Sequence, residues 1–88
     1  ALESDTDSFV NYTLSIEKVV LGLLFIELRN GFKVSFRSKG IIPVNKLAEQ
    51  FGGGGHTNAA GARFHNDNMS EKIPEILKSS EKFLKNYT

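Results

Sequence analysis

The run Gly-Gly-Gly-Gly-His-Thr-Asn-Ala-Ala-Gly, from Gly52 to Gly61, constrains the fold of this chain more than any other feature. Glycine has the most backbone freedom to lose on folding, so consecutive glycines are costly in ordered structure. Such a run is typical of a loop whose bare N–H groups approach a ligand closely. The Ala-rich stretch from His56 to Ala60 predicts a short helix whose positive N-terminus faces the same place. The expected ligand is an anion such as phosphate.

The glycine run differs from two better-known phosphate loops. No Gly-Lys-Ser/Thr follows it, as a Walker A loop requires. A dinucleotide fingerprint would need a third glycine where the chain has Thr57 and Asn58. His56 can donate hydrogen bonds to phosphate, and Asn58 offers a donor and an acceptor to a base or sugar. The alternatives are a flexible connector between two helices and a histidine that only caps a helix or is partly buried.

A second candidate site lies on the segment from Phe32 to Ser38, in which apolar and polar residues alternate. In a strand, this alternation places Lys33, Ser35, Arg37 and Lys39 on one face. Arginine binds phosphate in bidentate fashion, and serine adds a hydroxyl group. The stripe therefore predicts an anion-binding strand, with an ordinary solvated strand face as the alternative.

The hydrophobic pattern predicts an α+β fold: a small mixed sheet, with an antiparallel hairpin, in a single layer covered by a C-terminal helix. The continuous apolar run of the first strand is typical of burial on both faces, and Asn30-Gly31 is a strong hairpin signal. Gly52 is expected to end the middle helix as a C′ glycine. The predicted elements are strands at 19–28 and 32–38, a helix from Pro43 to Gly52, a short helix at 56–60, a strand at 62–65, and a helix from its N-cap Ser70 to about Asn86.

Composition narrows the function further. A chain of 88 residues is one small domain, and a net charge of +1 argues against a broad nucleic-acid-coating surface. The absence of cysteine excludes disulfides and thiolate metal sites, and two histidines without a carboxylate cluster do not predict a metal site. No apolar stretch is long enough to span a bilayer, so we expect a cytoplasmic protein without a membrane partner. No Ser-His-Asp order or pair of carboxylates on one helical face appears, so the chain looks like a binding part without a reactive centre.

The glycine motif also resembles the signature of a known family. Gly-Gly-Gly-His-x-x-Ala-Ala-Gly, from Gly53 to Gly61, is similar to the motif of the C-terminal, DHH-associated domain of DHH phosphoesterases. The segments Phe9–Tyr12, Val34–Gly40 and Val44–Ala48 look like the surrounding pattern in one branch of that family. This branch contains the bacterial oligoribonucleases, or nanoRNases, that also act as 3′-phosphoadenosine-5′-phosphate phosphatases. The resemblance covers nearly the whole chain.

The resemblance implies that residues 1–8 are a linker or tail from an N-terminal catalytic domain, and that residues 9–88 form the substrate-binding domain. In the family, the N-terminal domain holds manganese ions on aspartates and histidines, and metal-activated water attacks a phosphate ester. These 88 residues contain no Asp-His-His motif. The fragment alone is therefore expected to be inactive and to need no cofactor, with Mn²⁺ in the missing domain. The implied partners are short RNA or a 3′-phosphorylated nucleotide and the catalytic domain in cis, and the full-length protein could form a homodimer.

The same resemblance assigns roles to the two candidate sites. It implies that Gly53, Gly54, Gly55 and His56 hold the substrate phosphate, that Arg37 and Ser38 hold the nucleotide further out, and that Asn58 supports the loop; Ser35 and Lys39 are secondary candidates. Three alternatives stay open. They are the equivalent domain of a cyclic-di-AMP phosphodiesterase, an RNA-binding module like the related domain of alanyl-tRNA synthetases, and an interaction domain whose glycines only bend the chain.

Overall fold

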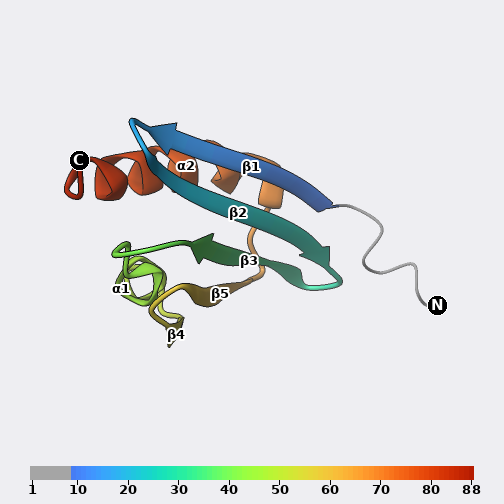
Figure 1. The fold of residues 1–88 in the computed structure, drawn as a ribbon. Coiled ribbons are helices and arrows are strands. Elements are labelled where there is room, and N and C mark those ends of the chain that lie inside the picture. The colour runs from blue at the N-terminus through green and yellow to red at the C-terminus, as the bar shows by residue number, and fades with distance from the viewer. Residues whose placement is uncertain (1–8) are drawn as a thin grey trace.

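A computed structural model describes residues 9–88 as one five-stranded sheet with two helices (Figure 1). The strands lie in the order β1-β2-β3-β5-β4. The predicted α+β class and single layer of strands are confirmed, and all four pairings among the described strands are antiparallel. In chain order the elements are β1 (Phe9–Ile16), β2 (Val19–Leu28), β3 (Gly31–Ser38), α1 (Val44–Glu49), β4 (Gly54–His56), β5 (Ala59–His65) and α2 (Met69–Lys85).

The hairpin of β2 and β3 forms the centre of the core, as the sequence predicts. Leu28 pairs with Gly31 across the turn, and the register continues to Leu21 and Ser38. β2 is buried on one face only, because the residues between its core positions are half-buried or exposed. The prediction of burial on both faces is therefore wrong: an antiparallel sheet needs only one covered face. The core side chains of the hairpin are Leu21, Leu23, Phe25, Phe32, Val34 and Phe36, none more than 2% exposed.

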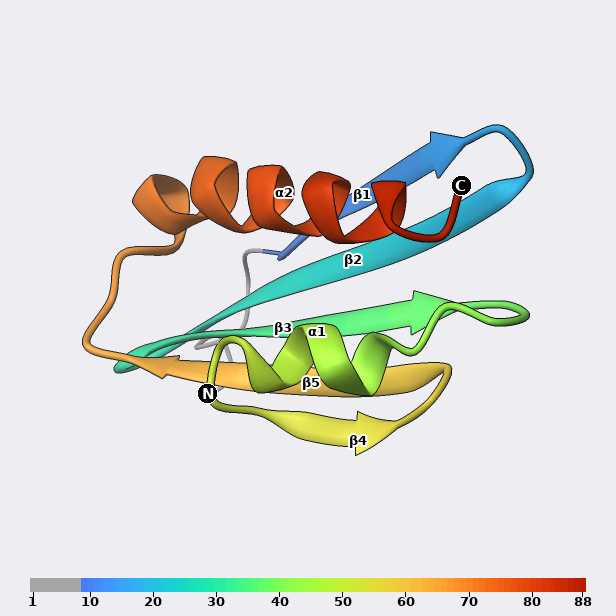
Figure 2. The ribbon, with the colours of Figure 1, turned by 90° about the vertical axis from the view of Figure 1, so that its left-hand side faces the viewer.

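Both helices cover the same face of the sheet, which Figure 2 shows from that side. The long helix α2 packs on β1 and β2, and the short helix α1 packs on β3, β4 and β5. Ile76 and Leu84 of α2 and Leu47 of α1 are fully buried in the core that the helices form with the sheet. Because the helices gather on one side, the opposite face of the sheet is left without a covering layer in residues 9–88.

The N-terminus of α2 begins earlier than the sequence predicts. Asn68 is the N-cap, and its side-chain oxygen accepts the N–H of Glu71 at 3.1 Å. Ser70, the predicted cap, is already inside the helix. Asn and Ser are comparable N-cap residues, so their adjacent signals cannot be ranked from sequence alone.

The glycine run ends α1 with a hydrogen-bonded turn. Gly52 has φ 81, and its N–H donates to the carbonyl of Glu49 at 3.1 Å. The N–H of Gly53 donates to the carbonyl of Ala48 at 2.9 Å. These two bonds and the left-handed glycine make a Schellman motif. The predicted role of Gly52 as a C′ glycine is thus confirmed.

The predicted helix at 56–60 is wrong. β4 ends at His56, Thr57 and Asn58 form a turn, and β5 begins at Ala59, so the predicted strand at 62–65 starts three residues earlier. Alanine and glycine have low β propensity, but pairing with β3 draws this stretch into the sheet. Neither β1 nor β4 is among the predicted strands. The tail predicted for residues 1–8 lies outside the described residues.

No helix within residues 9–88 is long and apolar enough to cross a membrane.

Adjacent glycines of the run should differ sharply in their tolerance of a side chain. A Cβ at Gly53 would clash with the carbonyl oxygen of Gly61 and come within 2.7 Å of the Cα of Ala62, whereas a Cβ at Gly54 meets nothing within 4 Å. We expect Gly53→Ala to lower the free energy of unfolding by about 2 kcal/mol or more, as overpacking against backbone does. Gly54→Ala should change it by less than about 0.5 kcal/mol. Urea denaturation of both variants measures the difference, and equal losses would contradict the strand geometry.

Candidate functional site

The open face of the sheet brings the two predicted sites together. Arg37 pairs with Gly22 of β2 on one side and with Ala59 of β5 on the other, and Ala59 pairs with His56 of β4. Directly paired residues share a face, so Arg37 and His56 lie in one row on the open face, with Cα atoms about 10 Å apart. Arg37 and the glycine run therefore meet on one surface, although they are far apart in the sequence.

An open hollow of about 560 Å³ lies on this face and is shared by Arg37 and the glycine run, Gly52 to Gly55. Its floor includes Ala59 and Gly61 of β5, which leave the backbone nearly bare. Gly61 is held close to β3, since a Cβ there would lie 3.0 Å from the carbonyl oxygen of Val34. A ligand in the hollow can consequently approach main-chain atoms without meeting bulky side chains.

The position of the glycine run follows from the helix before it. Phe51 directly precedes the run and stacks on Phe36 of β3, with ring centroids 6.1 Å apart and an interplanar angle of 13°. After Gly52 and Gly53 cap α1, Gly54 and Gly55 continue as β4. The run is therefore an ordered connection from helix to edge strand, which argues against the flexible-connector alternative.

Only part of the run can offer its amides to a ligand. The N–H groups of Gly52 and Gly53 are used in capping α1, so the expected free amide at Gly53 is absent. β4 is an edge strand of the described sheet, and alternate N–H groups of an edge strand point away from its partner. No helix follows His56, so the expected contribution of a helix N-terminus is absent as well.

The charge of the hollow is entirely positive. Lys33, Arg37 and Arg63 line it, and no aspartate or glutamate does. Lys33 lies directly opposite Arg63 across the β3–β5 pairing. Like charges opposite each other are destabilising, and within residues 9–88 neither side chain forms an ion pair. This arrangement favours an anion on the surface.

Arg63 is the residue that sequence reasoning missed. It lies at the end of the hollow furthest from Arg37, two positions beyond Gly61 on the same face of β5. The sequence contains one signal for Arg63: it lies two residues after Gly61, and in a strand this spacing places both residues on one face. That spacing acquires meaning only once β5 is paired with β3.

Ser38 and Asn58 hold the loop that follows β3. The hydroxyl of Ser38 donates to the carbonyl of Ile42 at 2.7 Å. The amide Nδ2 of Asn58 donates to the Ser38 hydroxyl at 3.0 Å and to the carbonyl of Gly40 at 3.2 Å. These bonds hold the loop after β3, whereas the resemblance implied that Asn58 supports the glycine loop. Ser38 also holds the loop after β3, because its hydroxyl proton is donated to the carbonyl of Ile42.

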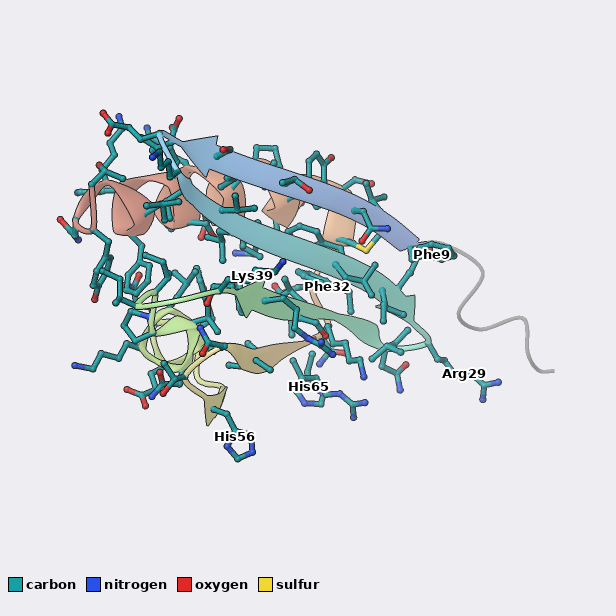
Figure 3. The ribbon with its side chains drawn as sticks, viewed as in Figure 1. Phe9, Arg29, Phe32, Lys39, His56 and His65 are labelled. Carbon is teal, nitrogen blue, oxygen red and sulfur yellow. The ribbon has the colours of Figure 1, made fainter. Side chains whose placement is uncertain are left out.

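The remaining predicted residues lie around the hollow. Ser35 lines it beside Gly61, its partner on β5. Lys39 is exposed and lines a neighbouring hollow of about 400 Å³ together with Arg37, Ser38 and Asn58. His56 is exposed at the end of β4 and points outward in Figure 3. It does not line the hollow, although it shares the row of Arg37.

Residues 9–88 contain no group of three or more His, Asp or Glu side chains that could hold a metal ion. The described residues therefore do not fit a metal centre of their own.

Three bacterial proteins are similar to the chain. A Thermus thermophilus protein named bifunctional oligoribonuclease and PAP phosphatase NrnA is 32% identical over 77 residues, covering 88% of this chain and 24% of that protein. The protein of the same name from Mycoplasma pneumoniae is 46% identical over 54 residues, covering 60% of the chain and 16% of the relative. A probable NrnA of Streptococcus mutans is 31% identical over 78 residues, covering 88% and 25%.

The chain thus spans at most about a quarter of the length of these relatives. The DHHA1 domain family matches residues 3–86, which is nearly the whole chain. The strands, the glycine run and the open face with Arg37 all fall within the matched residues. The chain belongs to the DHHA1 domain family.

Proposed function

We propose that the open face binds the phosphate of a short oligoribonucleotide or of a 3′-phosphorylated nucleotide such as 3′-phosphoadenosine-5′-phosphate. The observation that carries this proposal is the hollow shared by Arg37 and the glycine run, which has a bare backbone floor and no carboxylate in its lining. A phosphate needs close approach and positive charge, and both are available on this surface. The names of the NrnA relatives suggest this substrate class.

Arg37 is the principal ligand in this proposal. Its guanidinium group can donate two parallel hydrogen bonds to a phosphate, which a lysine in its place could not do. Ser35 adds a hydroxyl in the next row, beside Gly61 and Gly54. His56 lies at the outer edge, where its ring can donate to a substrate that extends across β4. Ser38 acts mainly by holding the loop beside Arg37.

The hydrolytic chemistry belongs, in this proposal, to another part of the full-length protein. The relatives are about four times or more as long as the stretch that this chain matches. We propose a two-domain phosphoesterase of the cytoplasm in which an N-terminal DHH domain in cis carries Mn²⁺, which would activate water there. The role of this chain is to position the phosphate ester, and alone it should bind without hydrolysing.

Two rivals differ in their ligands. A domain from a cyclic-di-AMP phosphodiesterase should bind the cyclic dinucleotide more tightly than the linear pApA. A non-catalytic RNA-binding module should bind structured RNA with a steep salt dependence. The observation that favours this alternative is the absence of carboxylates from the lining of the hollow. Titrating the chain with linear pApA, cyclic di-AMP and tRNA separates the three, and the proposal requires linear pApA to bind most tightly.

Removal of the guanidinium group should weaken nucleotide binding. We expect Arg37→Ala to lose about 1.5–3 kcal/mol of binding free energy for 3′-phosphoadenosine-5′-phosphate, the range for a hydrogen bond to a charged group. Arg37→Lys should recover only part of the loss, because it restores charge without the bidentate geometry. Isothermal titration measures both. Lys46→Ala, which removes an exposed cation from α1, is the matched control; if it weakened binding as much, Arg37 would have no specific role.

A side chain at Gly54 should fill the hollow without disturbing the fold. Because a Cβ there meets nothing within 4 Å, Gly54→Val has room on the open face. We expect the variant to stay within about 1 kcal/mol of the wild type in stability and to lose at least about tenfold in nucleotide affinity, equivalent to about 1.4 kcal/mol. Thermal unfolding and titration on the same preparation test both parts. Normal binding by a folded Gly54→Val protein would show that the ligand sits elsewhere.

A further inference from the structure

A second hollow lies beside the glycine-run hollow, at the far end of the open face. This second hollow, of about 260 Å³, is formed by the β2–β3 turn and the end of β5. Arg63 lines both hollows, so the two hollows are neighbours on the surface. His65 lies two residues beyond Arg63 on the same face and is exposed. The register sets His65 opposite Gly31, and Gly31 pairs with Leu28 at the β2–β3 turn that carries Arg29.

The lining of the second hollow has the same charge bias as the first. It includes Arg29, Arg63 and His65 but no carboxylate, although the chain has ten aspartates and glutamates. Arg29 already has an interaction partner, so the argument for a ligand uses Arg63 and His65. Arg63 faces the like charge of Lys33 and has no carboxylate partner within residues 9–88. An anion beside Arg63 would relieve this repulsion.

The spacing along β5 separates this end of the face from Arg37. Ala59, the partner of Arg37, is four residues from Arg63 and six from His65. At about 3.4 Å per residue, these separations are roughly 14 Å and 20 Å along the strand. A phosphate held beside Arg37 and Gly54 is therefore out of reach of His65. A single ligand can occupy both ends only if it carries phosphates about this far apart along an extended chain, which the two phosphates on one ribose are not.

We propose that Arg63 and His65 form an outer subsite for a phosphate further along a single-stranded oligonucleotide whose first phosphate lies in the glycine-run hollow. This inference rests on the proposed function and extends it to the length of the substrate. A mononucleotide occupies only the inner position. An oligonucleotide of several residues follows the open face from Arg37 toward the β2–β3 turn and gains a second ionic contact at Arg63.

The test compares two ligands on the same protein. The 88-residue chain and its Arg63→Gln variant are titrated with adenosine 3′,5′-bisphosphate and with a 5′-phosphorylated pentaadenylate, each at two salt concentrations. We expect Arg63→Gln to weaken pentaadenylate binding about three- to tenfold and to lower the salt slope by about one, as loss of one phosphate contact does. Binding of the bisphosphate should weaken clearly less than that of pentaadenylate, because Arg63 lies at the end of the inner hollow furthest from Arg37. Lys46→Gln, the same charge change on α1, should alter neither affinity.

Each other result overturns a defined part of the proposal. Equal weakening of both ligands would place Arg63 in the inner position and refute an outer subsite. An unchanged pentaadenylate affinity would refute it too, as would wild-type protein that binds both ligands equally well. If the wild type bound neither ligand, the proposed function would fail along with the subsite. His65→Gln provides a second variant, with a smaller loss expected for pentaadenylate only.

Discussion

The antiparallel pairing of β3 with β5 is the constraint on which the rest of the structure depends. Its register sets Phe36 opposite Ala60 on the core side and Arg37 opposite Ala59 on the open side. A slip of one residue would turn Arg37 into the core and expose Phe36, at a cost of about 2–3 kcal/mol for that one ring. The same hydrophobic alternation that specifies the core therefore places the guanidinium group beside the glycine run. Folding energy and site geometry are set by one interaction.

The one-sided arrangement of the helices gives this site its charge as well as its access. Both helices lie on the core face, so the open face presents only what the strands carry. Lys33, Arg37 and Arg63 project there, and the hollow that they line contains no carboxylate. A net charge of +1 thus conceals a hollow whose charged lining residues are all positive. Net charge alone cannot reveal such segregation, because it averages over faces that meet different partners.

The parts of the fold that sequence predicts are those with strong local signals. The β2–β3 hairpin, α1 with its terminal Gly52, and α2 each follow from periodicity, turn residues or capping. β4 and the first half of β5 could not be predicted, since glycine and alanine enter a sheet only where a neighbouring strand already holds them. β1 also has a local signal in the alternation of Val10, Tyr12, Leu14 and Ile16, although it is not among the predicted strands. Arg37 and the glycine run could be found because their chemistry is local, and their binding roles stay predictions. The place of Arg63 in the hollow can be recognised only once the register of β5 against β3 is known. The use of the Gly52 and Gly53 amides in capping can be recognised only once the end of α1 is known.

The central claim is that nucleotide phosphate binds to the open face between Arg37 and the glycine run. Backbone amide NMR of the labelled chain, titrated with adenosine 3′,5′-bisphosphate, tests it most directly. The account predicts that the largest shift changes cluster at Ser35, Arg37, Gly54 and Gly61, with the amides of α2 nearly unmoved. Shift changes concentrated on α2 or on β1 would contradict the account.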